Sequence, residues 1–328
     1  MTEKNIVQTV HDTLWDVMKD DDRVVVLGED VGARGGVFRA TAGFLDEFGE
    51  ERVIDTPLAE SGIVGVAIGM AMHGMLPVAE IQFADFIHPA FDQLVSEAAR
   101  IRYRSAGDWN CPLVVRAPWG GGVHGALYHS QSIEAFYGHV PGLKVVLPST
   151  PHDVKGMLLA AINDPDPVIF LEHKKTYRLI KGDVPDEDYE VPIGKAEVKR
   201  EGEDLTVVAY GLMLHHALEA AGRLEEEEGF STEVVDVRTI APLDKETILQ
   251  SVRKTGKALV VYEDNRTYGA GAEISATIAE ELMFNLDAPV TRIGGPDVPA
   301  MGFAGPLEHA FMPDVEKIFA SMKELAKF

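Results

Sequence analysis

Short runs of β-branched and other apolar residues alternate along this chain with segments whose apolar positions recur every three to four residues. The runs predict strands and the periodic segments predict amphipathic helices. In the first part of the chain the expected strands are residues 24–27, 78–83, 113–115, 144–147 and 168–171, and the expected helices lie near 5–19, 60–73, 89–104 and 151–163. This alternation is typical of an α/β fold with a mostly parallel sheet.

A polar and charged segment interrupts the alternation at residues 183–204, and we expect a linker there because it contains prolines and no apolar period. Beyond it the pattern predicts a second α/β unit. Its expected strands are 205–209, 233–237, 258–262 and 290–293, and its expected helices lie near 212–226, 245–254 and 270–284. The sequence thus predicts two domains, 1–182 and 205–328, each with a mostly parallel sheet flanked by helices, and a length of 328 residues suits two domains.

Composition narrows the class of protein. The 53 Asp and Glu residues against 30 Lys and Arg give a formal charge of −23, which opposes binding to nucleic acid or anionic lipid. No apolar run approaches the roughly 20 residues of a membrane span, and no basic segment followed by an apolar one suggests secretion. We therefore expect a cytoplasmic protein without a membrane partner. Cys111 is the only cysteine, and we expect it to be a small buried residue.

Two titratable residues in the first half are candidates for chemistry. Thr56 and Pro57 suit the N-cap and first position of the helix expected at 60–73, which places Glu60 in its first turn. An acid there is either favoured by the helix dipole or catalytic. His129 lies in a loop-like segment, where it is either structural or an acid–base group near neutral pH. The glycines of the same helix, at positions 62, 65 and 69, favour close packing against another helix, either within the domain or at a subunit interface.

Three sequence blocks occur in a fixed order: Asp-Thr-Pro-Leu-Ala-Glu at 55–60, Val-Ala-Glu-Ile-Gln-Phe-Ala-Asp-Phe at 78–86, and His-Gly-Ala-Leu-Tyr-His-Ser-Gln-Ser at 124–132. Together with Gly-Glu-Asp-Val-Gly at 28–32 and Val-Val-Asp-Val-Arg-Thr at 234–239, they resemble the β subunits of the thiamine diphosphate-dependent 2-oxo acid dehydrogenases. These are the decarboxylating components of the pyruvate and branched-chain complexes. The resemblance covers essentially the whole chain and implies a transketolase-like pyrimidine-binding domain followed by a transketolase C-terminal-like domain.

The resemblance also implies roles for individual residues. Glu60 would be the carboxylate that bonds to the pyrimidine ring of the cofactor and so makes the cofactor's own amino group basic. His129 would face the substrate and assist proton transfer when the acyl group passes to a lipoyl arm. The other residues implied for the cofactor pocket are Glu29, Leu58, Ala59, Gln82 and Phe86.

Part of the expected site is missing from this sequence. Family members hold the cofactor diphosphate through Mg²⁺ with a Gly-Asp-Gly motif, and no such motif occurs here. The resemblance therefore implies an α subunit that supplies the magnesium site, an α2β2 heterotetramer that shares the cofactor, and a chain that is inactive alone. It also implies a lipoyl transacylase partner and, more weakly, a monovalent cation such as potassium. The residues that match the cation site are Leu113, Ala161, Asp164 and Asp166, although 163–167 also suits an ordinary turn.

Several interpretations of the function remain open. The first is a β subunit that acts on branched-chain 2-oxo acids in preference to pyruvate. An acetoin dehydrogenase β subunit shares the same machinery, and a transferase of the transketolase type could be split into two chains. A scaffold subunit without catalytic function would leave Glu60 and His129 unexplained. The Gly120-Gly121-Gly122 run lacks the ending of a P-loop, so a nucleotide site is not expected there.

Overall fold

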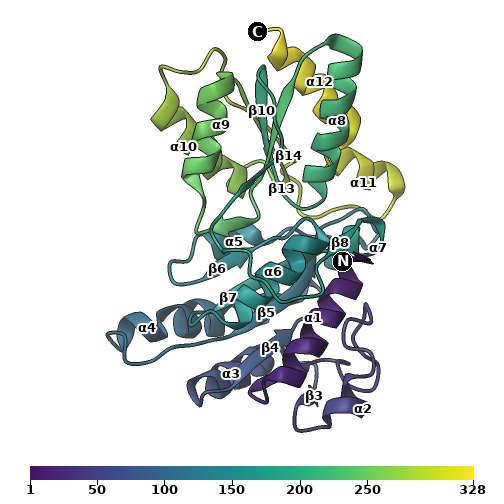
Figure 1. Ribbon diagram of the computed structural model, residues 1–328, viewed down its shortest axis with the longest axis vertical. Helices are drawn as coiled ribbons and strands as arrows, with labels where there is room; N and C mark the ends of the chain where they lie inside the picture. The colour runs from purple at the N-terminus through teal and green to yellow at the C-terminus, as the bar shows by residue number, and fades with distance from the viewer. The chain divides into compact units, whose positions relative to one another are not determined.

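The computed structural model describes residues 1–328 and divides into two units (Figure 1). The first unit comprises Met1–Trp119 and Phe136–Ile193, and the second comprises Gly120–Ala135 and Gly194–Phe328. Both are α/β units with mostly parallel sheets, which confirms the predicted fold class. Segment 120–135, expected in the first domain, groups with the second unit. The segment expected as a linker, 183–204, contains an edge strand of the second sheet, β9 (Glu197–Arg200).

The strands of the first unit run in the order β6-β7-β5-β4-β2-β3, and every neighbouring pair is parallel. The strands predicted at 24–27, 144–147 and 168–171 are observed close to these positions as β2, β6 and β7. A separate antiparallel pair joins β1 to β8. The strand bounds are β1 Thr2–Asn5, β2 Val24–Gly28, β3 Val53–Asp55, β4 Leu76–Glu80, β5 Val114–Trp119, β6 Lys144–Val146, β7 Val168–His173 and β8 Lys181–Val184.

The helices of the first unit begin where the sequence provides caps. Asn5 forms a capping box with Gln8 at the start of α1, and Thr150 caps α6 ahead of Pro151. The apolar faces of α1 and α6 pack into one core with β2 and β7. The α-helices are α1 Ile6–Asp20, α2 Phe44–Phe48, α3 Glu60–Met72, α4 Ile101–Arg104, α5 Glu134–Gly138, α6 Pro151–Ile162 and α7 Thr176–Leu179.

The continuous helix predicted at 89–104 is wrong. The segment instead consists of a 3-10 helix η1 (Ala84–Ala90), a π-helical turn η2 (Gln93–Glu97), a second 3-10 turn η3 (Ala98–Arg100) and α4. Pro89 lies inside η1, and proline removes a backbone donor that an α-helix would use there. The break changes the direction of the chain shortly after β4.

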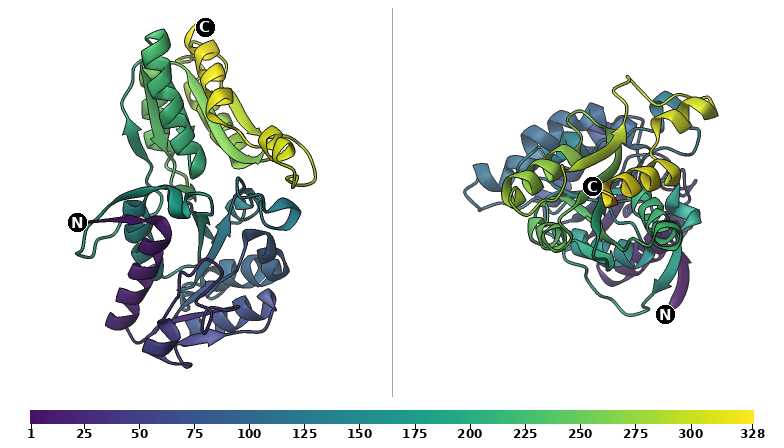
Figure 2. Two further views of the ribbon diagram at one scale, coloured as in Figure 1. Left: turned by 90° about the vertical axis from the view of Figure 1, so that its right-hand side faces the viewer. Right: turned by 90° about the horizontal axis from the view of Figure 1, so that it is seen from above.

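The second unit has a sheet in the order β14-β13-β10-β11-β9, in which only β9 is antiparallel. Helices α9 and α10 cover one face of this sheet, whereas α8 and α12 lie side by side on the other (Figures 1 and 2). Its further elements are η4 Ala126–Tyr128, α8 Leu212–Glu228, α9 Lys245–Thr255, α10 Ala270–Leu282, α11 Gly305–Phe311, α12 Val315–Ala326, β10 Leu205–Ala209, β11 Thr232–Asp236, β12 Thr239–Ala241, β13 Ala258–Asn265 and β14 Thr291–Gly295.

Cys111 is buried, and burial raises the pKa of its thiol to about 12. No helix combines the length and the apolar character needed to cross a bilayer.

Candidate active site

Three parallel strands of the first unit end side by side, and most of the predicted site residues follow these ends. The register pairs Gly28 of β2 with Asp55 of β3 on one side and with Glu80 of β4 on the other. Ligands of open α/β sheets bind at the carboxyl ends of the strands. Glu29 comes directly after β2, and Gln82 comes two residues after β4. The fold therefore brings together residues that are far apart in the sequence.

The loop after Glu29 is fixed by a carboxylate from the neighbouring strand. Asp55 accepts hydrogen bonds from the backbone N–H of Gly32 at 2.6 Å and of Ala33 at 3.3 Å. A Cβ on Gly32 would lie 2.6 Å from the Asp55 carboxylate, so this close approach requires glycine. Asp55 thus holds the loop that begins at Glu29 against the start of the segment that leads to Glu60.

Glu60 is the first residue of α3, as expected, but Thr56 is not its N-cap. The N-cap is Ala59, which offers no side-chain acceptor, and the Thr56 hydroxyl is buried without a hydrogen-bond partner. Glu60 is only 9% exposed, and its carboxylate makes no hydrogen bond or ion pair within the chain. The carboxylate oxygens still reach the surface, so this carboxylate is an acceptor available to a ligand.

Glu29 and Glu60 face each other closely enough to interact electrostatically. Burial, and after it the negative charge of Glu60, raises the pKa of the Glu29 carboxyl. The Glu29 carboxyl is therefore easier to protonate than an isolated one.

The other predicted pocket residues follow the ends of β3 and β4 in the chain. Gln82 is half-buried and donates from Nε2 to the Asp30 carboxylate at 3.2 Å. Phe86 is half-buried on η1, with its ring edge-to-face against Phe83 at 5.8 Å. Leu58 and Ala59 are exposed, and 78% of Leu58 is accessible although it is apolar. An exposed leucine beside a nearly buried carboxylate suits contact with a planar ligand.

A buried ion network lies under this end of the sheet. The Arg116 guanidinium on β5 donates to Glu80 at 2.8 Å and to both oxygens of Glu172 on β7 at 2.6 and 2.7 Å. Tyr177 donates to the same Glu172 at 2.5 Å. Arg116 is 1% exposed, so the three strands β4, β5 and β7 are joined by charges that water does not reach. The sequence analysis did not identify this network.

His129 lies in the second unit, in the segment 120–135. It follows the 3-10 turn η4 and is half-buried. The amide N–H of Gly121 donates to Glu263, and those of Gly122 and His124 donate to Glu308 at 3.0 Å each. Sequence reasoning missed both glutamates. Glu263 directly follows the predicted strand 258–262, and a polar residue at a strand end can be recognised in the sequence as a candidate site residue. Glu308 lies in no recognisable motif.

The four residues matched to a cation site do not form a vacant set of ligands. Lys144 Nζ lies 2.6 Å from both carboxylate oxygens of Asp164, and Arg102 Nε donates to Asp166 at 2.5 Å. The carbonyls of Leu113 and Ala161 accept backbone N–H groups, from Val168 at 2.8 Å and from Asp164 at 3.3 Å. The protein's own cations pair with the two carboxylates in this structure, and a potassium ion held by these residues stays a prediction.

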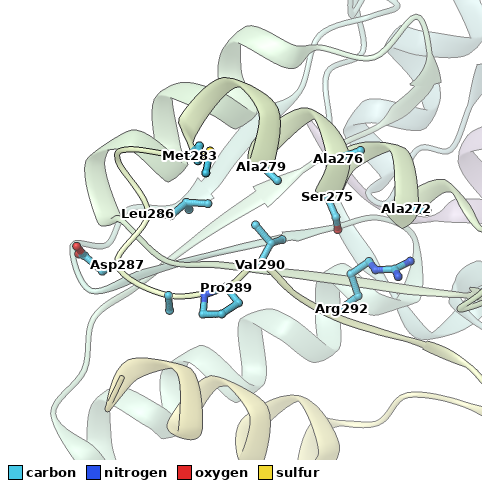
Figure 3. A pocket seen from close by; sticks show the side chains of 11 residues that line it. Ala272, Ser275, Ala276, Ala279, Met283, Leu286, Asp287, Pro289, Val290 and Arg292 are labelled. Atoms are coloured by element: carbon cyan, nitrogen blue, oxygen red, sulfur yellow. The ribbon is translucent and has the colours of Figure 1, made fainter.

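One open hollow of the second unit contains none of the predicted site residues. It measures about 680 Å³ and lies between α10 and the loop before β14 (Figure 3). Arg292 and Ser275 lie at one end, and Asp287 lies at the other (Figure 3). Its other lining residues are Ala272, Ala276, Ala279, Met283, Leu286, Ala288, Pro289 and Val290. An alanine-lined surface with so few polar groups lacks the means for acid–base chemistry.

Comparisons with known proteins show the family to which the chain belongs. Residues 3–180 match the family "Transketolase, pyrimidine binding domain", and residues 194–318 match "Transketolase, C-terminal domain". The chain is 58% identical to the 2-oxoisovalerate dehydrogenase subunit beta of Bacillus subtilis, over the full length of both chains. It is 50% identical to the pyruvate dehydrogenase E1 component subunit beta of Acholeplasma laidlawii, over 98% of each. This chain belongs to the β subunits of the 2-oxo acid dehydrogenases.

A solved structure extends the likeness to the fold. The β subunit superposes with a TM-score of 0.78 on a split-gene transketolase described as an inactive beta4 tetramer, with 98% of each chain covered and 24% sequence identity. At that identity the similarity shows the fold alone. Both domains of this β subunit are therefore transketolase-like, and its family is one of thiamine diphosphate-dependent oxidoreductases.

The site residues of the β subunit fit the pyrimidine end of thiamine diphosphate. The Glu60 carboxylate is nearly buried and unpartnered, so it can accept a hydrogen bond from a protonated ring nitrogen. Leu58 provides exposed apolar surface two residues before Glu60, and Phe86 lies on η1, which packs against α3. When bound, thiamine diphosphate supplies the carbon nucleophile that decarboxylation of a 2-oxo acid needs.

Proposed function

We propose that this β subunit, together with an α subunit, decarboxylates a branched-chain 2-oxo acid in preference to pyruvate. The observation that supports the proposal most is the Glu60 carboxylate, which is 9% exposed and has no partner within the chain. A ligand that provides a hydrogen-bond donor at this position would give the carboxylate the partner that the chain itself does not supply. The 58% identity to a 2-oxoisovalerate dehydrogenase subunit, against 50% to a pyruvate dehydrogenase subunit, favours the branched-chain substrate.

In this proposal Glu60 holds a proton between its carboxylate and the pyrimidine ring nitrogen, and Glu29 adjusts the charge around it. The charge of Glu60 contributes to the raised pKa of Glu29, so a change of charge at Glu60 changes the proton affinity of Glu29. Gln82, Phe86, Leu58 and Ala59 position the ring. These assignments require the ring to lie beside the first turn of α3.

His129 has a separate role in the proposal. Its imidazole can accept and donate a proton near neutral pH, which suits transfer of the acyl group to a lipoyl arm. The lipoyl group would be supplied by a transacylase, and the acidic surface of a chain with net charge −23 favours a basic docking partner.

The α subunit completes the proposed site in an α2β2 heterotetramer. The sequence of the β subunit contains no Gly-Asp-Gly motif, so the diphosphate and its Mg²⁺ are assigned to the α subunit. We expect the purified β subunit with thiamine diphosphate and Mg²⁺ to release no CO2 from 2-oxo acids. Co-expression with the α subunit of the same genome should restore release, measured with an artificial electron acceptor.

The same assay tests the substrate. A pocket distinguishes substrates that differ by a methyl-sized group by about 10- to 200-fold. We expect kcat/KM for 3-methyl-2-oxobutanoate to exceed that for pyruvate by at least about tenfold. Release by the β subunit alone would contradict the shared site, and a preference for pyruvate would contradict the branched-chain assignment. Cleavage of acetoin but of neither 2-oxo acid would support the acetoin dehydrogenase alternative, and activity with none would support a scaffold.

The exposed face of α3 is the proposed contact with the α subunit. Gly62, Gly65, Val66, Gly69 and Met72 form one exposed apolar stripe, and 57% of Val66 is accessible. Helix α3 is apolar on all sides, which is typical of a helix buried in an assembly. A side chain on Gly69 would meet nothing within 4 Å in the isolated chain.

We therefore expect Gly69→Leu to weaken heterotetramer formation by about tenfold or more, because a large side chain overpacks a close helix contact. The isolated chain should be equally or more stable, since glycine in a helix interior costs about 0.5–1 kcal/mol. Analytical ultracentrifugation and thermal unfolding measure the two effects. Gly222→Leu on α8 is the matched control, because that helical glycine also has open space around it. Normal assembly of Gly69→Leu would place the interface elsewhere.

A further inference from the structure

The segment 120–135, which contains His129, is fixed at both ends by polar side chains of the second unit. Near its start, three backbone amides donate to two glutamates. Gly121 donates to Glu263 near the end of β13, and Gly122 and His124 donate to Glu308 on α11. Near its end, the Tyr210 hydroxyl donates to the fully buried Glu134 carboxylate at 2.8 Å. The fixed ends leave a short loop whose conformation is determined by these contacts.

Glu308 makes the largest number of these contacts. Its Oε1 accepts the amides of Gly122 and His124 at 3.0 Å each, and its Oε2 lies 2.7 Å from Nδ1 of the His124 imidazole. The Glu308 side chain is 8% exposed, whereas that of His124 is 64% exposed. Hydrogen bonds to a carboxylate are stronger than neutral ones, and shielding from water strengthens them further.

The backbone held by Glu308 has a conformation that it would not adopt by itself. His124 and Ala126 have φ of +56° and +57°, in the left-handed region that residues with a Cβ rarely occupy. Such conformations persist where the surrounding structure imposes them. The contacts of Glu308 with both the amide and the imidazole of His124 provide that constraint.

A direct packing contact links this region to His129. A Cβ on Gly125 would lie 2.6 Å from the carbonyl oxygen of His129 and 2.8 Å from its Cβ, so the backbone at 125 rests on His129. The turn η4 closes the chain between the two residues. A change in the backbone at 124 must therefore displace His129.

We propose that Glu308 is a positioning residue that holds the segment 120–135 in the conformation that presents His129 to the acyl group. The inference rests on the proposed function of His129 in transfer to the lipoyl arm. Glu308 lies on α11, near the C-terminus, whereas His129 and the sequence blocks that indicate acyl transfer lie in the first half of the chain. Glu263 has a supporting role through the amide of Gly121.

The test compares Glu308→Gln with the wild type in the assembled heterotetramer. We expect transfer of the acyl group to a lipoyl domain to fall by about 10- to 100-fold, because misplacement of a catalytic group by about 1 Å has effects of that size. CO2 release to an artificial acceptor should stay within about twofold, since His129 is not assigned to that step. Hydrogen exchange at the amides of Gly122 and His124 should become faster, because a neutral amide oxygen accepts these two hydrogen bonds more weakly than a carboxylate.

Two further variants separate the possible causes. Glu324→Gln on α12 removes the same charge from an exposed position without an ion pair. It should change neither acyl transfer nor hydrogen exchange at Gly122 and His124. His124→Asn keeps Glu308 and both amide hydrogen bonds, and asparagine tolerates the positive φ. It should reduce acyl transfer while the Gly122 amide stays protected, and this result would remain available if Glu308→Gln failed to fold.

The outcomes are distinguishable from failure of the proposed function. Unchanged exchange together with an unchanged ratio of acyl transfer to CO2 release in Glu308→Gln would overturn the inference, and so would an equal fall in both activities. His129→Ala serves as the reference. If that variant transfers the acyl group normally, the proposed function of His129 is wrong, whereas the exchange measurement still decides whether Glu308 fixes the segment.

Discussion

We expect Glu60→Gln in the assembled heterotetramer to lower decarboxylation of the 2-oxo acid by about 10²- to 10⁴-fold, the range usual for loss of an acid–base group. Glutamine has nearly the same shape as glutamate, so the start of α3 should be preserved. The amide cannot take up a proton, however, and it removes the charge that helps to raise the pKa of Glu29. CO2 release in single-turnover and steady-state assays measures the loss.

Binding of thiamine diphosphate should persist in this variant, because the amide oxygen still accepts a hydrogen bond. A ligand at 100 times its Kd stabilises a protein by about 2.7 kcal/mol, which a thermal shift detects. Glu51→Gln is the control, since Glu51 is an exposed residue of the same unit without an ion pair. Decarboxylation at the wild-type rate in Glu60→Gln would show that Glu60 does not activate the cofactor.

The second large effect is expected on stability. Arg116→Met should lower the free energy of unfolding by about 3–5 kcal/mol, because it leaves Glu80 and Glu172 buried without their common cation. Arg104→Met is the matched control. Arg104 also lies 2.8 Å from its partner, Glu97, but both side chains are nearly half exposed. Loss of an exposed pair costs about 0–1 kcal/mol.

The deficit of Arg116→Met should depend on pH. Burial raises the pKa of Glu80 above its usual value of 4.5 even though Arg116 lowers it. A carboxyl with a raised folded pKa weakens the fold as the pH rises from its unfolded pKa through its folded pKa. Without Arg116 the folded pKa rises further, so the loss at neutral pH grows.

Urea unfolding at about pH 5 and about pH 7.5 tests this sign, since the linkage makes the deficit smaller at the lower pH. Glu80 is then partly protonated in the variant and its burial without a partner costs less. A deficit that is equal at both pH values, or larger at the lower one, would mean that the network does not act through the charge of Glu80.

Much of the fold could be predicted from the sequence because its signals are local. The helix predicted at 60–73 is observed as Glu60–Met72, and the strand predicted at 205–209 is observed as Leu205–Ala209. The helix predicted at 89–104 was not found, since a π-turn and 3-10 turns place apolar residues at nearly the same spacing as an α-helix. The strand β9 was missed because an edge strand needs few apolar residues.

The candidate site was less accessible to sequence reasoning because it depends on register. Glu29 and Glu60 come together only since Gly28 pairs with Asp55, and no spacing along the chain contains that information. The resemblance to a family supplied the pair, and their roles stay predictions. Glu308 and His124 are separated by 184 positions, so only the folded chain shows their contact.

The antiparallel pair β1–β8 affects how the protein is made. Thr2 pairs with Val184, so β1 waits for a partner strand that is synthesised after nearly the whole first unit. At about 5–20 residues per second the delay is roughly 10 to 40 s. Helix α1 follows β1 directly and packs against α6, so it too must remain without its partner for much of that time. The nascent chain therefore presents an amphipathic helix to chaperones before its own core exists.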